Sequence, residues 1–217
     1  MSNSHRVITH ISFDLDGTLV DCCDLHFNAF NYAIECIDGK EFILSYEEHL
    51  KNYNALSTIQ KIGKYLENTT ELKQEKIQRL YGLKQEYTKS HLYEFVKKDE
   101  RIKELIHYLD LDRYHLSCVT NSIKQTTHTI LEILEIKSYF SCIISNEDVI
   151  TPKPHPEGYL RSMAYLGKTP LETLIIEDSE KGIEAASKSC ANVMTVKDSS
   201  YVTLENIQKC IEKIKKQ

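Results

Sequence analysis

The chain has 217 residues and a formal net charge of −5, from 27 Lys and Arg against 32 Asp and Glu. This acidic balance argues against a nucleic-acid binder, whose domain carries an excess of basic side chains. No apolar run approaches the roughly 20 residues that a membrane-spanning helix needs, and the first ten residues lack the apolar stretch of a signal peptide. We therefore expect a cytoplasmic protein with neither a nucleic-acid nor a membrane partner.

A buried strand opens the predicted fold at residues 7–13, a short β-branched and apolar segment that ends at Asp14. A helix follows at 24–37, with Asp21 or Asp24 available as its N-cap. The next stretch is helical throughout, because its apolar residues recur at three- and four-residue spacing. Its predicted helices are 46–53, 57–66 and 71–92.

Strands and helices alternate in the rest of the chain. The predicted strands are 115–119, 142–144, 173–176 and 192–196, and the predicted helices are 100–109, 123–134, 156–166, 181–188 and 204–214. This alternation is typical of an α/β fold with a Rossmann-like, doubly wound parallel sheet. The helical stretch interrupts the alternation after the first strand. We therefore predict a core domain of residues 1–22 and 93–217 and an inserted helical-bundle cap of residues 23–92.

Two carboxylates, Asp14 and Asp16, follow the first strand directly and precede Gly17. Two acids at a strand end can converge on one site, where one attacks phosphorus and the other transfers a proton. The glycine permits a sharp turn close to a ligand. Two solvated aspartates flanking an ordinary turn are the alternative, because Asp-Gly is common in turns, so the string gains weight from the other strand ends.

Polar residues also follow the second core strand and precede a later helix. Thr120, Asn121 and Ser122 end the 115–119 strand, where a hydroxyl and main-chain amides can bind phosphate oxygens. A simple helix cap is the ordinary alternative. Lys153 lies between two prolines that restrict its backbone, so its ammonium can be presented to a transferring phosphoryl group. A rigid surface loop is the alternative there.

A pair of acids, Glu177 and Asp178, follows the 173–176 strand, with Ser179 and Gly182 opening the next helix. Paired carboxylates at a strand end suit a hard cation that prefers oxygen ligands. Capping of the helix by Asp178 is the ordinary explanation. Together the strand ends supply a nucleophile, a proton-transfer group, a phosphate-binding turn, a cation and a metal-binding pair, which indicates phosphoryl transfer.

These motifs, spread from residue 11 to about residue 196, resemble the haloacid dehalogenase-like hydrolase superfamily. The likeness is to the branch with a helical cap, which contains phosphoglycolate phosphatases and β-phosphoglucomutases. The residues that carry it are Asp14-x-Asp16-Gly17-Thr18, Thr120-Asn121-Ser122, Lys153 in Lys-Pro-x-Pro-x-x-Tyr159, and Glu177-Asp178-Ser179-x-x-Gly182.

The resemblance implies catalytic roles for Asp14, Asp16 and Lys153. Asp14 would form an aspartyl-phosphate, Asp16 would protonate the leaving oxygen and then activate water, and Lys153 would bridge Asp14 and the phosphate. Mg²⁺ would be the cofactor, held by Asp14, Asp16, Asp178 and Glu177, the last directly or through other ligands. Thr120 and Asn121 would bind the phosphoryl oxygens.

His26 lies on the first predicted cap helix, where relatives also carry a histidine, and is a candidate substrate-binding residue. A histidine on a helix surface is an equal alternative. The expected function is that of a Mg²⁺-dependent phosphatase acting on a small metabolite, such as a sugar phosphate, phosphoglycolate or a nucleotide. A β-phosphoglucomutase-like phosphomutase and a non-catalytic binding protein on the same fold are the alternatives. We expect a monomer or a homodimer.

Overall fold

The computed structural model of the chain describes residues 7–67 and 74–216. The chain forms two compact units, which are unit 1 with residues 1–21 and 97–217 and unit 2 with residues 22–96. The beginning of the predicted 71–92 helix and the first six residues of the segment tested for a signal peptide lie outside the described residues. Among the described helices, none has both the length and the apolarity required to cross a bilayer.

Unit 1 is built on a five-stranded sheet with the order β3-β2-β1-β4-β5, and all of its pairings are parallel. The strands are β1 (His10–Phe13), β2 (His115–Val119), β3 (Cys142–Ile144), β4 (Thr173–Glu177) and β5 (Asn192–Thr195). Phe13, at the end of β1, pairs with Cys118 on one side and with Ile176 on the other. β1 and β4 are buried along their whole length because helices cover both faces of the sheet.

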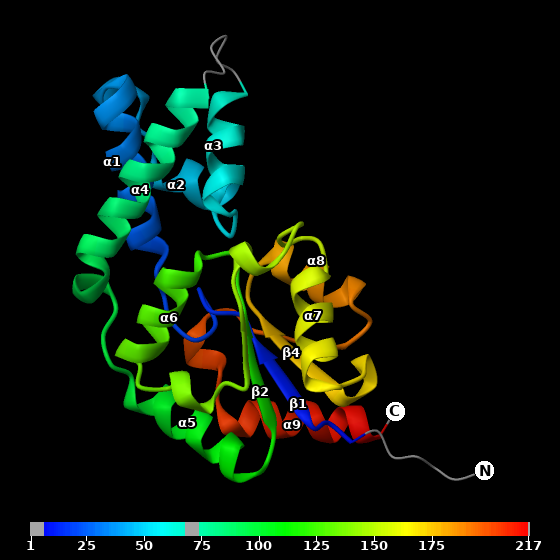
Figure 1. The fold of residues 1–217 in the computed structure, drawn as a ribbon. Coiled ribbons are helices and arrows are strands. Elements are labelled where there is room, and N and C mark those ends of the chain that lie inside the picture. Colours follow the sequence, from blue (N-terminus) through cyan, green and yellow to red (C-terminus); the bar gives the residue numbers. More distant parts are fainter. Residues whose placement is uncertain (1–6, 68–73, 217) are drawn as a thin grey trace. The chain divides into compact units, whose positions relative to one another are not determined.

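The helices of unit 1 are α5 (Glu100–Leu111), α6 (Lys124–Ile133), α7 (Glu157–Leu166), α8 (Glu180–Lys188) and α9 (Leu204–Lys215). Figure 1 shows α5 and α6 on one side of the sheet and α7 and α8 on the other. This confirms the predicted Rossmann-like, doubly wound α/β fold. The strand order reverses between β1 and β4, and ligands bind beyond the carboxyl ends of the strands at such a point.

Unit 2 is a helical bundle. Its longer helices are α1 (Cys23–Asp38), α3 (Thr58–Leu66) and α4 (Gln74–Phe95), and its short turns are η1 (Lys40–Phe42), α2 (Tyr46–Glu48) and η2 (His49–Tyr53). α4 packs against α1 and α3 around a core that includes Phe30, Ile62, Leu66 and Leu80. The sequence predicts that the helical cap ends at residue 92. The last helix of unit 2, α4, continues to Phe95, and Leu92 is still buried.

One local prediction for unit 2 is confirmed with a change of helix type, and another is wrong. The predicted 46–53 helix is α-helical only in its first turn and then becomes the π-helical turn η2, in which Asn54 N donates to His49 O. The first helix has no aspartate cap, since Cys22 occupies the N-cap position and makes no side-chain capping bond. Asp24 lies in the first turn, where its charge still favours the helix dipole.

Candidate active site

Three carboxylates meet at the point where the strand order reverses. Asp14 follows β1, Glu177 is the last residue of β4, and Asp178 comes next. Their ligand atoms all lie within 4.8 Å of one another. The main chain holds them in register, because Asp14 N donates to Ile176 O at 3.0 Å across β1 and β4. The structure thus brings together acids that are more than 160 residues apart in the chain.

Lys153 supplies the positive charge at this cluster. Its Nζ lies 2.5 Å from Asp14 Oδ1, 2.6 Å from Glu177 Oε1 and 2.7 Å from the carbonyl oxygen of Val119. The side chain is only 6% exposed, so these bonds are shielded from solvent. One ammonium therefore connects the end of β1 with the ends of β2 and β4.

The turn after β2 uses its side chains to hold Lys153 and Asp16 in place. The Asn121 amide group holds the Lys153 backbone at both ends: Lys153 N donates to Oδ1 at 3.0 Å, and Nδ2 donates to Lys153 O at 3.2 Å. Ser122 Oγ donates to Asp16 Oδ2 at 2.8 Å. The simple helix-cap alternative is wrong, because Ile123 is the N-cap of α6 and makes no side-chain capping bond. Thr120 is buried, and its Oγ1 accepts from Ser122 N.

Two glycines make room for the acids. Gly17 has φ of +90°, and a Cβ on it would clash with the Asp178 carboxylate. A Cβ on Gly182, in the first turn of α8, would clash with the Glu177 carboxylate. Ser179, not Asp178, caps α8, because its Oγ accepts from Gly182 N at 3.2 Å. The capping explanation for Asp178 is therefore wrong, and its carboxylate accepts a hydrogen bond from Thr18 instead.

The electrostatics of the site show an excess of negative charge. Burial and repulsion by Glu177 raise the pKa of Asp14 well above its usual range, although Lys153 opposes the shift. Burial and Glu177 also raise the pKa of Asp178 to about 6. Burial disfavours the charge on Lys153, but attraction by Asp14 and Glu177 outweighs it and raises the pKa of the lysine. A single ammonium does not balance three carboxylates.

Tyr159 belongs to the site and was not among the predicted site residues. Its hydroxyl donates to Glu177 Oε1, and Lys153 Nζ lies 4.9 Å from the centre of its ring. The residue is 1% exposed. The sequence contained the signal, because Tyr159 stands at a fixed distance from Lys153 in the Pro-rich motif. Its hydroxyl was overlooked because a tyrosine on a helix usually packs through its ring.

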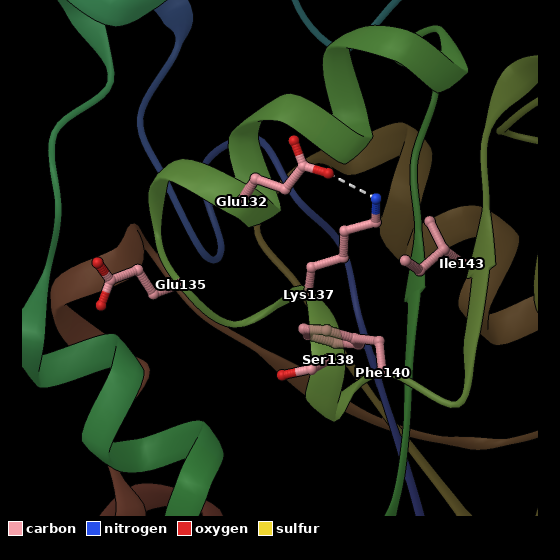
Figure 2. Close-up of a pocket in the computed structure, with 6 residues that line it drawn as sticks. All are labelled: Glu132, Glu135, Lys137, Ser138, Phe140 and Ile143. Atoms are coloured by element: carbon pink, nitrogen blue, oxygen red, sulfur yellow. Dashed lines mark hydrogen bonds and ion pairs between the residues drawn. The ribbon is translucent and has the colours of Figure 1, made fainter.

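The remaining predicted residue, His26, lies in unit 2 on α1, where its Nδ1 is 3.4 Å from Lys84 Nζ. A surface pocket in unit 1 contains none of the predicted site residues (Figure 2); it is lined by Glu132, Glu135, Lys137, Ser138, Phe140 and Ile143. Glu132 pairs with Lys137 at 2.6 Å, and Glu135 pairs with Lys98 and Lys103. Its charges are thus paired within the protein.

The donor set at the strand ends fits a divalent cation. Asp14, Glu177 and Asp178 offer carboxylate oxygens, the ligands that Mg²⁺ prefers. A bound cation would also relieve the repulsion that raises the pKa values of Asp14 and Asp178.

The doubly wound α/β fold carries a cluster of acids and a lysine at the point where the strand order reverses. Proteins with this fold bind ligands beyond the carboxyl ends of their strands. The sequence profile of the haloacid dehalogenase-like hydrolases matches residues 11–196. The chain belongs to this family, whose members generally use a divalent metal ion.

Individual relatives have names that include phosphatases and phosphomutases. The chain is 26% identical to a pyrophosphatase PpaX of Anoxybacillus flavithermus, over 95% of this chain and 94% of the relative. The structure of a β-phosphoglucomutase from Clostridium difficile is similar with a TM-score of 0.81 at 20% identity, covering 97% of this chain and all of that chain. CbbY from Rhodobacter sphaeroides in complex with phosphate gives 0.80 at 19% identity, covering 93% and 100%. These structural likenesses concern the fold alone.

Proposed function

We propose that this chain is a Mg²⁺-dependent phosphatase that hydrolyses a small phosphorylated molecule through an aspartyl-phosphate on Asp14. The observation that carries the proposal is the bond between the Lys153 ammonium and the Asp14 carboxylate, 2.5 Å long, beside the two acids after β4. A carboxylate held in this way is oriented for attack, and the Lys153 ammonium offsets negative charge on the phosphoryl group.

In the first half of the reaction, an oxygen of ionised Asp14 attacks phosphorus and the bond to the leaving oxygen breaks. Asp16 gives its proton to that oxygen, so that a neutral alcohol departs. The hydrogen bond from Ser122 Oγ to Asp16 Oδ2 keeps the Asp16 carboxyl group oriented during this transfer. Thr120 and the Asn121 main-chain amide would bind the phosphoryl oxygens, and Asn121 also holds the loop that carries Lys153.

In the second half, Asp16 removes a proton from water, and the resulting hydroxide attacks phosphorus. The bond between phosphorus and the Asp14 oxygen breaks, which releases inorganic phosphate and returns both aspartates to their starting states. When bound by the Asp14 and Asp178 carboxylates and the Asp16 main-chain carbonyl, Mg²⁺ would supply charge compensation for the phosphoryl oxygens. Glu177 completes this set through its charge and through its bonds to Lys153 and Tyr159.

The substrate class has two candidates. A phosphomonoester of a small metabolite follows from the sequence motifs. A phosphoanhydride is the second, because a relative that is 26% identical over nearly its whole length is named a pyrophosphatase. A phosphomutase would use the same residues and keep water from the aspartyl-phosphate. His26 stays a predicted substrate-binding residue, and a cytoplasmic monomer or homodimer stays the expected state.

The Asp14→Asn substitution tests the proposal. The side chain keeps its size but loses its negative charge, so we expect turnover and covalent phosphate capture to disappear. The measurements are phosphate release from phosphomonoesters and pyrophosphate with and without Mg²⁺, and the mass of the acid-quenched protein. Circular dichroism checks the fold. Hydrolysis at the wild-type rate by the variant would rule out Asp14 as the nucleophile.

A further inference from the structure

The end of β2 holds Lys153 by its side chain and by its main chain. The Lys153 ammonium donates to the carbonyl oxygen of Val119, the last residue of β2, at 2.7 Å. Two residues further along, the Asn121 side chain bonds to the main chain of the same lysine. Lys153 N donates to Asn121 Oδ1 at 3.0 Å, and Asn121 Nδ2 donates to Lys153 O at 3.2 Å. One side chain thus joins segments that lie 32 residues apart.

The residues around Lys153 explain why a side chain makes these bonds. Pro152 and Pro154 have no N–H group, so Lys153 N is the one main-chain donor of this tripeptide. The prolines restrict the backbone dihedral angles of the loop, but they do not determine where the loop lies relative to β2. The Asn121 amide has a donor and an acceptor side by side. It therefore pairs with the N–H and C=O groups of one residue, as a residue of an antiparallel strand does.

A second anchor of the loop comes from the helix that follows it. Ile150 N and Thr151 N donate to the carboxylate of Glu157, the first residue of α7, at 2.9 and 2.8 Å. These bonds attach the start of the loop to α7. The bonds from Asn121 attach the lysine itself to the end of β2, where the phosphate-binding turn is predicted.

The position of the loop matters because the Lys153 ammonium has to reach two acids at once. Its Nζ lies 2.5 Å from Asp14 Oδ1 and 2.6 Å from Glu177 Oε1. A loop displaced from β2 would carry the ammonium away from these oxygens. Displacement of a catalytic group by about 1 Å can lower a reaction rate about 10²-fold.

We propose that the Asn121 side chain is a positioning residue that acts on phosphoryl transfer through Lys153. It holds the loop at the place from which the ammonium bonds to both Asp14 and Glu177. The effect on turnover rests on the proposed function, whereas the placement of the ammonium does not. This role is separate from the phosphate binding predicted for the Asn121 main-chain amide, because a substitution of the side chain leaves that amide in the chain.

The first experiment observes the Lys153 ammonium of the full-length protein by nitrogen NMR, with Lys153→Met to assign its signal. We expect a signal protected from exchange with water in the wild type, because the ammonium is buried and hydrogen-bonded. Asn121→Ala should broaden or shift it. Asn121→Gln should do the same without loss of volume, because its extra methylene group moves the amide away from the Lys153 main chain.

Asn192→Ala is the matched control for the loss of an asparagine amide. Asn192 is also half-buried, and its Nδ2 donates to a main-chain carbonyl oxygen, that of Thr173, at 3.0 Å. It is the first residue of β5, so it lies at the edge of the sheet opposite to the acids. The Lys153 signal should be unchanged in this variant. A wild-type signal that is unprotected, or that persists unchanged in both Asn121 variants, would overturn the proposal.

The second experiment is a double-mutant cycle on phosphate release from a phosphomonoester, with circular dichroism to check each fold. Asn121→Ala should lower kcat about 10- to 10²-fold in the wild type. In the Lys153→Met background it should change kcat by less than about twofold, because the two residues act as a unit. Equal factors in both backgrounds would show that Asn121 does not act through Lys153. A wild type that releases no phosphate would contradict the proposed function, and the NMR result would still decide whether Asn121 holds the lysine.

Discussion

The two units bury charge of opposite sign and stabilise it differently. In unit 1, three carboxylates at strand ends surround the ammonium of Lys153, which bonds to two of them. In unit 2, the ammonium groups of Lys61 and Lys84 lie beside the rings of His49 and His26. Lys153 is the counter-ion of Asp14 and Glu177, so its removal would leave two buried carboxylates without their cation. In unit 2, burial and the charges of Lys61 and Lys84 lower the pKa of His49, which stays neutral beside Lys61.

The largest effect should come from matched lysine substitutions in the two clusters. Lys153→Met leaves Asp14 and Glu177 buried without their cation, so we expect a loss of about 3–5 kcal/mol in unfolding free energy. Turnover should fall at least 10²- to 10³-fold, on the order seen when one charge-stabilising group is removed. Lys61→Met removes a hydrogen bond to the neutral His49 ring, so we expect a smaller loss of about 1–3 kcal/mol.

Urea denaturation of both variants, read by circular dichroism, measures this contrast. Lys137, which is partly exposed, provides a control for the loss of a lysine from a surface pair, and Lys137→Met should change stability by less than about 1 kcal/mol. Equal destabilisation by Lys153→Met and Lys61→Met would contradict the distinction between the two clusters.

The sequence predicted the acid cluster of unit 1 because each member stands directly after a strand. Parallel strands bring their carboxyl ends to one edge of the sheet, so the sequence alone predicts that Asp14 and Asp178 meet there. The strand bounds followed from runs of β-branched and apolar residues. The predicted 115–119 and 142–144 strands agree with β2 and β3, whereas the predicted 7–13 strand forms a ladder only from His10.

Other contacts could not be predicted from the sequence because they depend on the direction in which a side chain points. Nothing in the Thr120–Ser122 string indicates that the Asn121 side chain bonds to the main chain of Lys153. The contacts of Lys61 with His49 and of Lys84 with His26 combine α1, η2, α3 and α4, whose packing has no local motif. The π-helical turn that places His49 was likewise hidden, because its apolar spacing is that of an ordinary helix.

Acid should weaken unit 1 through a histidine at the centre of its sheet. His10 is fully buried, with Nδ1 3.0 Å from Thr173 Oγ1 and Nε2 2.8 Å from Ser117 Oγ. Burial, followed by Lys168 and His115, lowers its pKa from 6.5 to about 4. Between these values the unfolded chain binds a proton that the folded chain does not, so stability falls as the pH falls. The loss approaches about 3 kcal/mol near pH 4.

The measurement is urea denaturation of wild type and His10→Asn at about pH 7 and about pH 4. The variant should lose less stability on acidification than the wild type, because other titrating groups, including His49, contribute to both proteins. An identical acid response in the wild type and His10→Asn would show that this histidine does not couple folding to pH.

A smaller effect should follow from Tyr159→Phe. The variant keeps the ring beside the Lys153 ammonium but loses the hydroxyl that donates to Glu177. Hydrogen bonds to charged groups contribute about 1.5–3 kcal/mol, which sets the expected loss of unfolding free energy. The Mg²⁺ concentration for half-maximal activity should also shift, because Glu177 would be oriented less firmly. If Tyr159 acts only in stability, Tyr159→Phe should be less stable than the wild type but need the same Mg²⁺ concentration.

The smallest effects compare one glycine from each unit. Gly182→Ala places a methyl group against the buried Glu177 carboxylate, so we expect a loss of about 1–3 kcal/mol as the acid is displaced. Gly63→Ala, within α3, meets no atom within 4 Å and should gain about 0.5–1 kcal/mol, because alanine loses less conformational entropy in a helix. Thermal unfolding measures both changes. If Gly182→Ala were more stable than the wild type, the prediction would be wrong, because the Glu177 carboxylate would have room to move away from the added methyl group.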